Sequence, residues 1–333
     1  MLDHGGGILA AARRYGIPVG DWLDLSTGLN PHGWPVGNLP AEVWQRLPQE
    51  HDGLEDAAAA YYGSPSLLPV AGSQAAIQSL PLLRTPGSRV GMLAASYAEH
   101  AHAWARHGHV VTGFAEHELL DAVAELDVVL VCNPNNPTGW QVPPETLLGW
   151  RENLAARGGW LIVDEAFMDC TPQHSLVPFV GEPGLIVLRS LGKFFGLAGA
   201  RVGFVFAWRE LLDALREELG PWTISGPGRA VAKAALRDTN WQVVALGQLT
   251  AESARLAALL TEHGLPPAGG TALFQWLTTP HAAELHDFLA ARGILIRHFA
   301  TSNSVRFGLP ADEGDWKRLA AALADFSMDS VTK

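Results

Sequence analysis

The sequence predicts an α/β protein with a mainly parallel sheet, and three observations lead to this fold class. Short apolar runs with the length of buried strands alternate with segments of helical periodicity over the first two thirds of the chain. The chain has 333 residues, enough for one large domain or for a large and a small one. Hydrophobic residues make up 48% and charged residues 17%, a globular composition that can fill a sizeable core.

The strand and helix patterns follow each other in a regular order. Apolar runs bounded by glycine, proline or asparagine predict strands. Helices that join consecutive strands act as crossovers, so the strands run parallel and helices cover both faces of the sheet. In such sheets ligands bind at the carboxyl ends of the strands. The predicted strands are Arg89–Leu93, His109–Thr112, Asp127–Cys132, Trp160–Val163, Leu185–Leu188 and Val202–Phe206, and the helices are Ser73–Leu83, Ala98–Arg106, Glu116–Glu125, Pro144–Arg157 and Trp208–Leu219.

The pattern changes after Gly220. Two long helical stretches lead into a smaller α+β pattern at the end of the chain. We therefore expect a large domain over 41–220, linking helices over 221–263 and a small C-terminal domain over 264–333, with residues 1–40 packing on the small domain. The elements expected here are helices Arg229–Arg237, Trp241–His263, His281–Arg292 and Gly314–Phe326, and strands Ala272–Leu277, Ile294–Arg297 and Ser304–Phe307.

The charge and composition exclude several classes of function. Lys plus Arg total 23 and Asp plus Glu total 34, so the formal net charge is −11. We expect no binding to nucleic acid or to an anionic membrane, because such binding needs a basic surface. The longest purely apolar runs, such as 128–132, are far shorter than the ~18 residues of a membrane span, and no secretory signal is visible. Two cysteines cannot form a disulfide framework, so the expected location is the cytoplasm.

Lysine is rare in this chain, and one lysine lies in an unusual place. Lys233 and Lys317 fall in helical patterns and Lys333 ends the chain, which is typical of solvated lysines. Lys193 instead follows a predicted buried strand, among apolar residues and glycines of the segment Arg189–Gly196. Burial favours a neutral amine, which is a nucleophile toward a carbonyl. The alternative is a structural lysine paired with a carboxylate.

Three further motifs stand close to predicted strand ends. The segment Cys132–Gly139 reads Cys-Asn-Pro-Asn-Asn-Pro-Thr-Gly, which could also be a simple turn. Asp164 and Glu165 end another strand, where an aspartate could also cap a helix. Arg201 follows Lys193 at the end of a loop rich in glycine and alanine. Each motif alone is weak evidence, but their order along the chain is specific.

This order resembles the fold-type-I enzymes that depend on pyridoxal 5'-phosphate (PLP), and the resemblance covers nearly the whole chain. It implies a large domain with a mainly parallel, seven-stranded type of sheet and a small α+β domain. On this reading Lys193 would bond covalently to PLP, and Asp164 would pair with the ring nitrogen so that the ring acts as an electron sink. Asn136 would hydrogen-bond the ring hydroxyl, and Tyr97 would stack on the ring face.

The same resemblance implies a cup for the cofactor phosphate. Gly72, Ser73 and Gln74 open a predicted helix, where backbone N–H groups and the helix dipole favour an anion. Ser190 and Arg201 would complete the cup.

Two branches of the superfamily are candidates. The segment Phe195–Arg201 is similar to the lysine-site signature of histidinol-phosphate aminotransferases. Other segments resemble the threonine-phosphate decarboxylases, which convert O-phospho-L-threonine to (R)-1-aminopropan-2-yl phosphate for the cobalamin side chain. We expect this decarboxylation, and a histidinol-phosphate or related aminotransferase is the alternative. The segments that favour the decarboxylase are His4–Ile8, Leu23–Pro31, Asp164–Asp169, Gly220–Ser225 and Ile294–Arg297.

The decarboxylase resemblance also implies a set of substrate contacts. Arg297 and Arg306 lie on two small-domain strands and could give a phosphate planar, charge-assisted pairs, although surface arginines are the simpler interpretation. The N-terminal histidine and glycine would close over the same phosphate. The alternative is that they belong to a flexible terminus and contact no substrate. The expected substrate residues are His4, Gly5, Asn30, Asn136, Arg297 and Arg306.

The chain departs from the family patterns at three places. It reads Ser26-Thr27-Gly28 where the decarboxylases have Ser-Ala-Asn, so one substrate contact is lost or replaced. Leu47 stands where an Arg-Tyr-Pro motif has the tyrosine that reaches the cofactor phosphate of a partner subunit. Phe167 replaces the tyrosine that bonds the ring hydroxyl in aminotransferases, which favours the decarboxylase branch.

The remaining alternatives concern metals and partners. Several histidines gather between His100 and His117, but His100 and His102 would diverge on a helix. We therefore expect solvent-exposed histidines on a surface helix and no metal site. The resemblance implies a homodimer acting on a small-molecule substrate. A PLP-fold binding protein without catalysis is disfavoured because Lys193, Asp164 and Asn136 are all present.

Overall fold

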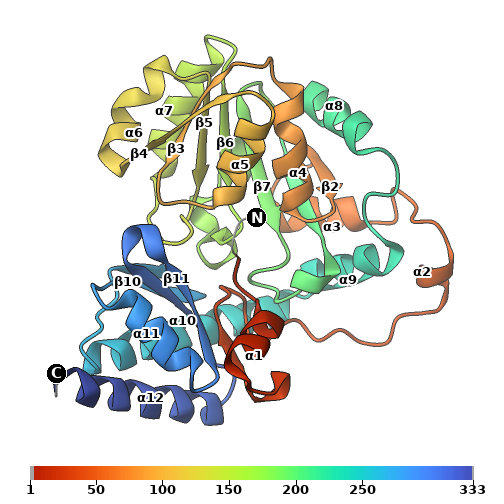
Figure 1. Ribbon diagram of the computed structural model, residues 1–333. Coiled ribbons are helices and arrows are strands. Elements are labelled where there is room, and N and C mark those ends of the chain that lie inside the picture. Colours follow the sequence, from red (N-terminus) through yellow and green to blue (C-terminus); the bar gives the residue numbers. More distant parts are fainter. Residues whose placement is uncertain (1–3, 332–333) are drawn as a thin grey trace. The chain divides into compact units, whose positions relative to one another are not determined.

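The computed structural model describes residues 4–331 and divides into two compact units (Figure 1). The large unit consists of Gly33–Asn136 and Trp140–Gln242. The small unit consists of Pro137–Gly139 and the described parts of Met1–His32 and Val243–Lys333. The domain boundaries expected from the sequence stay a prediction.

The large unit is built on a mixed seven-stranded sheet of strand order β2-β8-β7-β6-β5-β3-β4. The strands from β4 to β7 run parallel, as the helical crossovers predict. β8 runs antiparallel to β7 and β2, because no helical crossover separates it from β7. The strands are β2 (Leu67–Val70), β3 (Arg89–Leu93), β4 (Val110–Phe114), β5 (Val128–Cys132), β6 (Trp160–Asp164), β7 (Leu185–Ser190) and β8 (Gly203–Phe206).

Helices cover this sheet at limits close to those predicted. α7 begins at Pro144, where a proline costs nothing because the first N–H groups of a helix have no internal partner. The sequence pattern missed α2, α3 and β2, since α2 has only four residues and Pro69 lies within β2. The helices are α2 (Glu42–Gln45), α3 (Leu54–Tyr62), α4 (Ser73–Ser79), α5 (Ala98–Arg106), α6 (Glu116–Ala122), α7 (Pro144–Ala155), α8 (Arg209–Leu219) and α9 (Gly226–Arg237).

One hydrophobic layer joins the sheet to α4, α5 and α8. Alternate strand residues such as Leu130, Ile162 and Ile186 belong to it, together with Ile77 of α4 and Trp104 of α5. Side chains alternate between the faces of a strand. The last residues of β5, β6 and β7 with the same parity therefore point toward this helical layer.

The small unit has a five-stranded sheet of order β1-β11-β12-β10-β9. β1 pairs parallel with β11, so a segment near the N-terminus forms one edge of the sheet. The sequence pattern missed β1 and β9, because strands of three residues show no periodicity. It also missed α1, because the N-terminal segment that contains this helix is rich in glycine and proline. The elements are α1 (Ile8–Tyr15), β1 (Leu23–Leu25), α10 (Thr239–Glu262), β9 (Gly269–Thr271), β10 (Phe274–Thr278), α11 (Ala282–Ala290), β11 (Ile294–Phe299), β12 (Ser304–Gly308) and α12 (Glu313–Val331).

By length and composition alone, α10 could cross a membrane. It has 24 residues, and its most apolar 18-residue window has a mean hydropathy of 1.3 and is 28% buried. The helix also carries charged side chains with partners in the same unit: Glu252 pairs with His32, and Arg255 pairs with Glu313. Core helices of globular domains pass the same test, and the absence of a membrane span stays a prediction.

The aromatic core of the large unit gives a first test of the fold. Phe204 is completely buried, and its ring centroid lies 5.6 Å from that of Tyr62 and 6.4 Å from that of Phe206. We expect Phe204→Ala to lower the free energy of unfolding by about 3–5 kcal/mol, because the cavity cannot collapse within the sheet. Phe179 is 51% exposed, and Phe179→Ala should change it by less than about 0.5 kcal/mol. Equal losses in urea unfolding would contradict this core.

Candidate active site

The ends of neighbouring strands in the large unit lie at the same level. Cys132 of β5 pairs with Asp164 of β6, and Asp164 pairs with Leu188 of β7. Two residues further, Ser190 pairs with Gly203 of β8. Cys132, Asp164 and Ser190 also share the parity of the residues that face α4 and α5. The strand register therefore gathers these side chains at one edge and on one face of the sheet.

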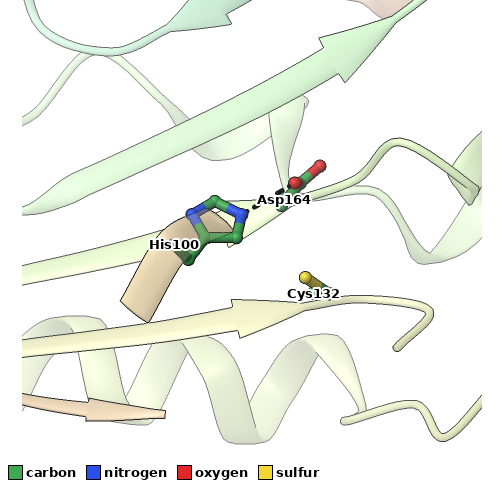
Figure 2. A group of neighbouring side chains, drawn as sticks. All are labelled: His100, Cys132 and Asp164. Atoms are coloured by element: carbon green, nitrogen blue, oxygen red, sulfur yellow. Dashed lines mark hydrogen bonds and ion pairs between the residues drawn. The ribbon is translucent and has the colours of Figure 1, made fainter. Parts of the chain in front are cut away.

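Asp164 is buried and held at both oxygens. Only 4% of the residue is exposed. Oδ1 accepts a hydrogen bond from the backbone N–H of Ala166 over 3.1 Å. Oδ2 lies 2.9 Å from Nε2 of His100 on α5. Figure 2 marks this contact with a dashed line. The carboxylate is thus fixed at the end of β6 by two separate contacts.

The position of His100 corrects a sequence-based expectation. The histidines of this region were expected on a solvent-exposed helix surface, but His100 is only 1% exposed and His109 only 6%. His102 is exposed, as expected. The helical periodicity of the sequence could have predicted this burial, since His100 shares one helix face with the apolar residues Ala103 and Trp104, which are also buried.

The surroundings of His100 favour its charged form. Burial by itself would lower the pKa of His100, but hydrogen bonds with Asp164 and Cys132 outweigh burial and raise the pKa to about 10. Nitrogen, sulfur and oxygen atoms of His100, Cys132 and Asp164 all lie within 4.8 Å of one another, a spacing that could hold a metal ion. The carboxylate of Asp164 can only accept, so Nε2 of His100 carries a proton and is not available as a metal ligand.

Tyr97 lies beside this pair at the start of α5. Its ring meets the His100 ring edge-on, with centroids 5.9 Å apart and an interplanar angle of 85°. Its hydroxyl donates to Oε1 of Gln74 over 3.4 Å, and Nε2 of Gln74 donates to Glu99 over 2.9 Å. Burial, with Glu99 and Asp164 nearby, raises the pKa of Tyr97 to about 12. The hydroxyl is therefore neutral at physiological pH.

The start of α4 forms a small cradle with the loop before β8. Gly72 has φ 72° and ψ 158°, which only glycine adopts readily, and a Cβ built there would lie 2.5 Å from Nη2 of Arg201. A Cβ on Gly203 would lie 2.6 Å from the backbone N of Ser73. Arg201 itself has a left-handed backbone, with φ 54°. The close approach requires glycine at both positions and brings a guanidinium to the N-terminus of α4.

Lys193 and Asn136 lie in loops that hydrogen bonds hold in place. Lys193 is half-buried, and its Nζ lies 5.2 Å from the centroid of the Phe167 ring. The backbone N–H of Gly196 donates to the Lys193 carbonyl over 3.1 Å. Asn135, next to Asn136, donates from Nδ2 to the Ala95 carbonyl over 2.8 Å and accepts at Oδ1 from Ser96.

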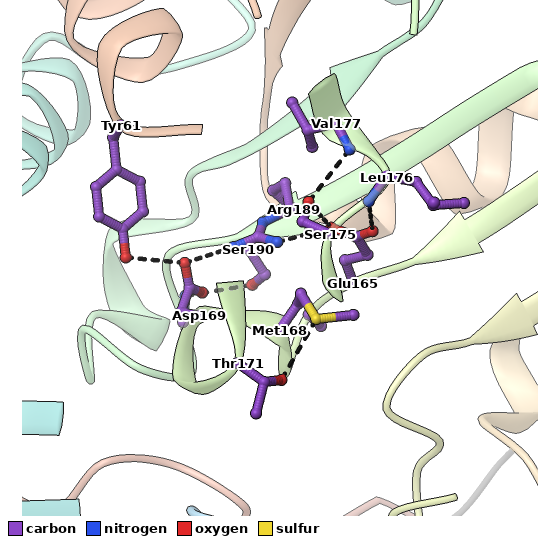
Figure 3. Close-up of polar contacts among 12 residues, drawn as sticks. Tyr61, Glu165, Met168, Asp169, Thr171, Ser175, Leu176, Val177, Arg189 and Ser190 are labelled. Carbon is purple, nitrogen blue, oxygen red and sulfur yellow. Dashed lines mark hydrogen bonds and ion pairs between the residues drawn. The ribbon is translucent and has the colours of Figure 1, made fainter. Parts of the chain in front are cut away.

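A buried ion cluster ties β6 to β7, and sequence reasoning did not identify it (Figure 3). Nη1 of Arg189 donates to Glu165 over 2.7 Å, and Nη2 donates to Asp169 over 2.6 Å. The guanidinium also lies 4.5 Å from the centroid of the Tyr62 ring. Burial raises the pKa of the Glu165 and Asp169 carboxyl groups, whereas Arg189 opposes this shift. A signal was present, because an arginine at the end of an apolar strand needs buried acids as partners.

In the small unit, Ser26 connects several of the expected substrate residues. Its carbonyl accepts from Nη2 of Arg306 over 2.9 Å, and its Oγ accepts from the backbone N–H of Gly6 over 2.7 Å. A Cβ on Gly5 would lie 2.4 Å from the same carbonyl. Arg297 pairs directly with Arg306 across β11 and β12.

A cavity of about 430 Å³ opens within the small unit beside these residues. His4, Ser26 and Arg297 are part of its lining. Burial and the neighbouring Arg297 lower the pKa of Arg306 to about 10, so two guanidinium groups repel each other there. An anion would relieve this repulsion. Asn30 is buried and forms a turn, its Oδ1 accepting from the His32 backbone N–H over 2.8 Å.

The residues of the large unit fit PLP. The close approach of the chain at Gly72 and Gly203 brings the Arg201 guanidinium to the backbone N–H groups at the start of α4, and such a set of donors suits a phosphate. The buried carboxylate of Asp164 can accept from a protonated ring nitrogen, and Lys193 offers an amine.

Comparison with known proteins identifies the family. The model for aminotransferase class I and II matches residues 43–323. The chain belongs to the class I and II aminotransferases. A threonine-phosphate decarboxylase of Pseudomonas aeruginosa is 58% identical to it over 98% of both chains, and one of a Sinorhizobium species is 43% identical over 97% of this chain and 98% of the relative.

The fold is confirmed by solved structures. A histidinol-phosphate aminotransferase from Sinorhizobium meliloti, in complex with pyridoxal-5'-phosphate, superposes with a TM-score of 0.86. It is 23% identical and covers 97% of this chain and 95% of its own. The predicted α/β fold and PLP as the cofactor are thereby confirmed for this family member. The roles of single residues stay predictions.

The ion cluster around Arg189 gives a second test. We expect Arg189→Met to lower the free energy of unfolding by about 3–5 kcal/mol, because it leaves two buried carboxyl groups without their cation. Arg209 pairs with Asp213 at the surface and is 89% exposed, so Arg209→Met is a matched control with a change below about 1 kcal/mol. Similar urea midpoints for both variants would contradict the role of the cluster.

Proposed function

We propose that the protein decarboxylates O-phospho-L-threonine, giving (R)-1-aminopropan-2-yl phosphate and carbon dioxide in cobalamin biosynthesis. The observation that carries this proposal is the pair of Arg297 and Arg306 beside the N-terminal glycine element, because it suits a phosphate-bearing substrate. Close similarity to threonine-phosphate decarboxylases along the whole chain supports it.

In the proposed site the large unit holds the cofactor. When bound, PLP supplies a ring that accepts the electron pair left by a breaking bond at the substrate Cα. Lys193 carries the cofactor, and Asp164 holds the ring nitrogen in its protonated form. Asn136 contacts the ring hydroxyl and the substrate. Tyr97 stacks on the ring. Gly72, Ser73, Gln74, Ser190 and Arg201 bind the cofactor phosphate.

Anchoring of the substrate decides which bond breaks. When bound, PLP would accept electrons only from the substrate bond that is aligned with its π system, so the anchoring of the substrate would select the bond that breaks. In a transaminase an arginine anchors the α-carboxylate, and the Cα–H bond is then the one that reacts. Here Arg297 and Arg306 take the phosphate, with His4, Gly5 and Asn30 closing over it. The α-carboxylate would then be left without these arginines, and Nζ of Lys193 would be the group that gives a proton to the substrate Cα.

An aminotransferase is the second candidate function. The segment Phe195–Arg201 favours it. Phe167 disfavours it, because a buried phenyl ring, 4% exposed, has no hydroxyl for the cofactor ring.

We further propose a homodimer located in the cytoplasm. Leu47, which replaces a tyrosine of the related enzymes, is 65% exposed in the single chain, and Trp44 nearby is 67% exposed. Large apolar side chains at the surface are typical of an interface.

The reaction is tested by incubating the purified protein with PLP and O-phospho-L-threonine. We expect one carbon dioxide per substrate consumed, without an added 2-oxo acid. Lys193→Ala should abolish this activity and the visible absorption of the bound cofactor. Formation of a keto acid only when 2-oxoglutarate is present would identify an aminotransferase instead. An unchanged absorption spectrum on substrate addition would favour a binding protein.

The phosphate role of the arginine pair is tested separately. Arg297→Gln should lower kcat/KM for O-phospho-L-threonine about 10- to 100-fold, mainly through KM, because one charge-assisted contact is lost. The spectrum of bound PLP should not change. Arg292→Gln, on a 39% exposed side chain of the same unit, serves as the control. An unaltered KM in the Arg297 variant would remove this residue from the phosphate site.

A further inference from the structure

His100 is a buried ionisable side chain to which the proposed chemistry assigns no role. It comes from α5 and points toward Asp164 at the end of β6 and toward Cys132 at the end of β5 (Figure 2). Its side chain is 1% exposed. Placing a histidine there costs desolvation free energy, which its polar contacts must offset.

The contact with Asp164 restricts the orientation of the carboxylate. Oδ2 accepts from Nε2 of His100 over 2.9 Å, while Oδ1 accepts from the Ala166 backbone over 3.1 Å. One donor on each oxygen defines the plane of the carboxylate. Without His100, the Ala166 contact would hold Oδ1 but would not fix the position of Oδ2.

His100 also contacts the ring of Tyr97. The two rings meet edge-on, at 5.9 Å and 85°. His100 therefore touches both the residue proposed to pair with the cofactor ring nitrogen and the residue proposed to stack on the ring face.

We propose that His100 is a positioning residue for the PLP ring: it holds the Asp164 carboxylate in the orientation that meets the ring nitrogen, and it supports the Tyr97 ring from the side. This inference rests on the proposed cofactor roles of Asp164 and Tyr97 and is independent of the substrate. The ionisable groups facing His100 are Asp164, Cys132 and Tyr97. With its pKa raised to about 10, His100 is a cation at neutral pH and a strong donor.

The first experiment measures the dissociation constant of PLP for the apoprotein. We expect His100→Leu to raise it about tenfold or more, and His100→Gln to raise it less, because an amide can still donate to Asp164 but carries no charge. His102→Leu, on an exposed side chain of the same helix, is the matched control and should leave it unchanged. The visible circular dichroism per bound cofactor should fall in the leucine variant and recover in part in the glutamine variant.

A double-mutant cycle separates positioning from a structural role. In an Asp164→Ala background, His100→Leu should weaken PLP binding much less than in the native background, because no carboxylate remains to be oriented. Equal weakening in both backgrounds would overturn the proposal, as would an unchanged dissociation constant for His100→Leu. If the leucine variant unfolds, the cycle is run with His100→Gln. If the native protein binds PLP but releases no carbon dioxide, the proposed function is refuted and the proposed role of His100 is not affected.

Discussion

The rest of the site depends on how the ends of β6 and β7 are held together. Arg189, near the end of β7, binds Glu165 and Asp169, which follow the end of β6. Because side chains alternate along a strand, the neighbours of this cluster, Asp164 and Ser190, point to the opposite face. One face thus carries a buried ion cluster, while the other face carries the carboxylate and the hydroxyl that we propose to bind the cofactor.

The acidic charge of the chain requires that the proposed phosphate sites depend on local groups. With a net charge of −11, long-range attraction does not favour a phosphate. In the large unit Arg201 lies against Gly72, and in the small unit Arg297 and Arg306 stand opposite each other. At both places guanidinium groups lie beside closely packed backbone at a glycine, Gly72 in the large unit and Gly5 in the small unit. The affinity that we propose for a phosphate would therefore come from local geometry rather than from overall charge.

Several elements of the fold were accessible from the sequence because local periodicity specified them. β3, α5 and the helical stretch of α7 follow apolar patterns bounded by glycine or proline. β1 and β2 were not accessible, since a strand of three residues or one that contains proline carries no such pattern. The antiparallel direction of β8 also escaped prediction, because it depends on the loop after Lys193 and not on the strand itself.

The sequence by itself determined the family, the cofactor and the candidate residues Lys193, Asp164 and Asn136. The order of the motifs along the chain can be recognised without knowing which residues are in contact. Only the tertiary structure decided the surroundings of these residues. That His100 is buried against Asp164, and that Arg189 pairs with two buried acids, depends on strand register and helix packing between segments far apart in the chain. Burial decides whether a polar side chain is solvated or must find a partner, and burial is a property of the folded chain.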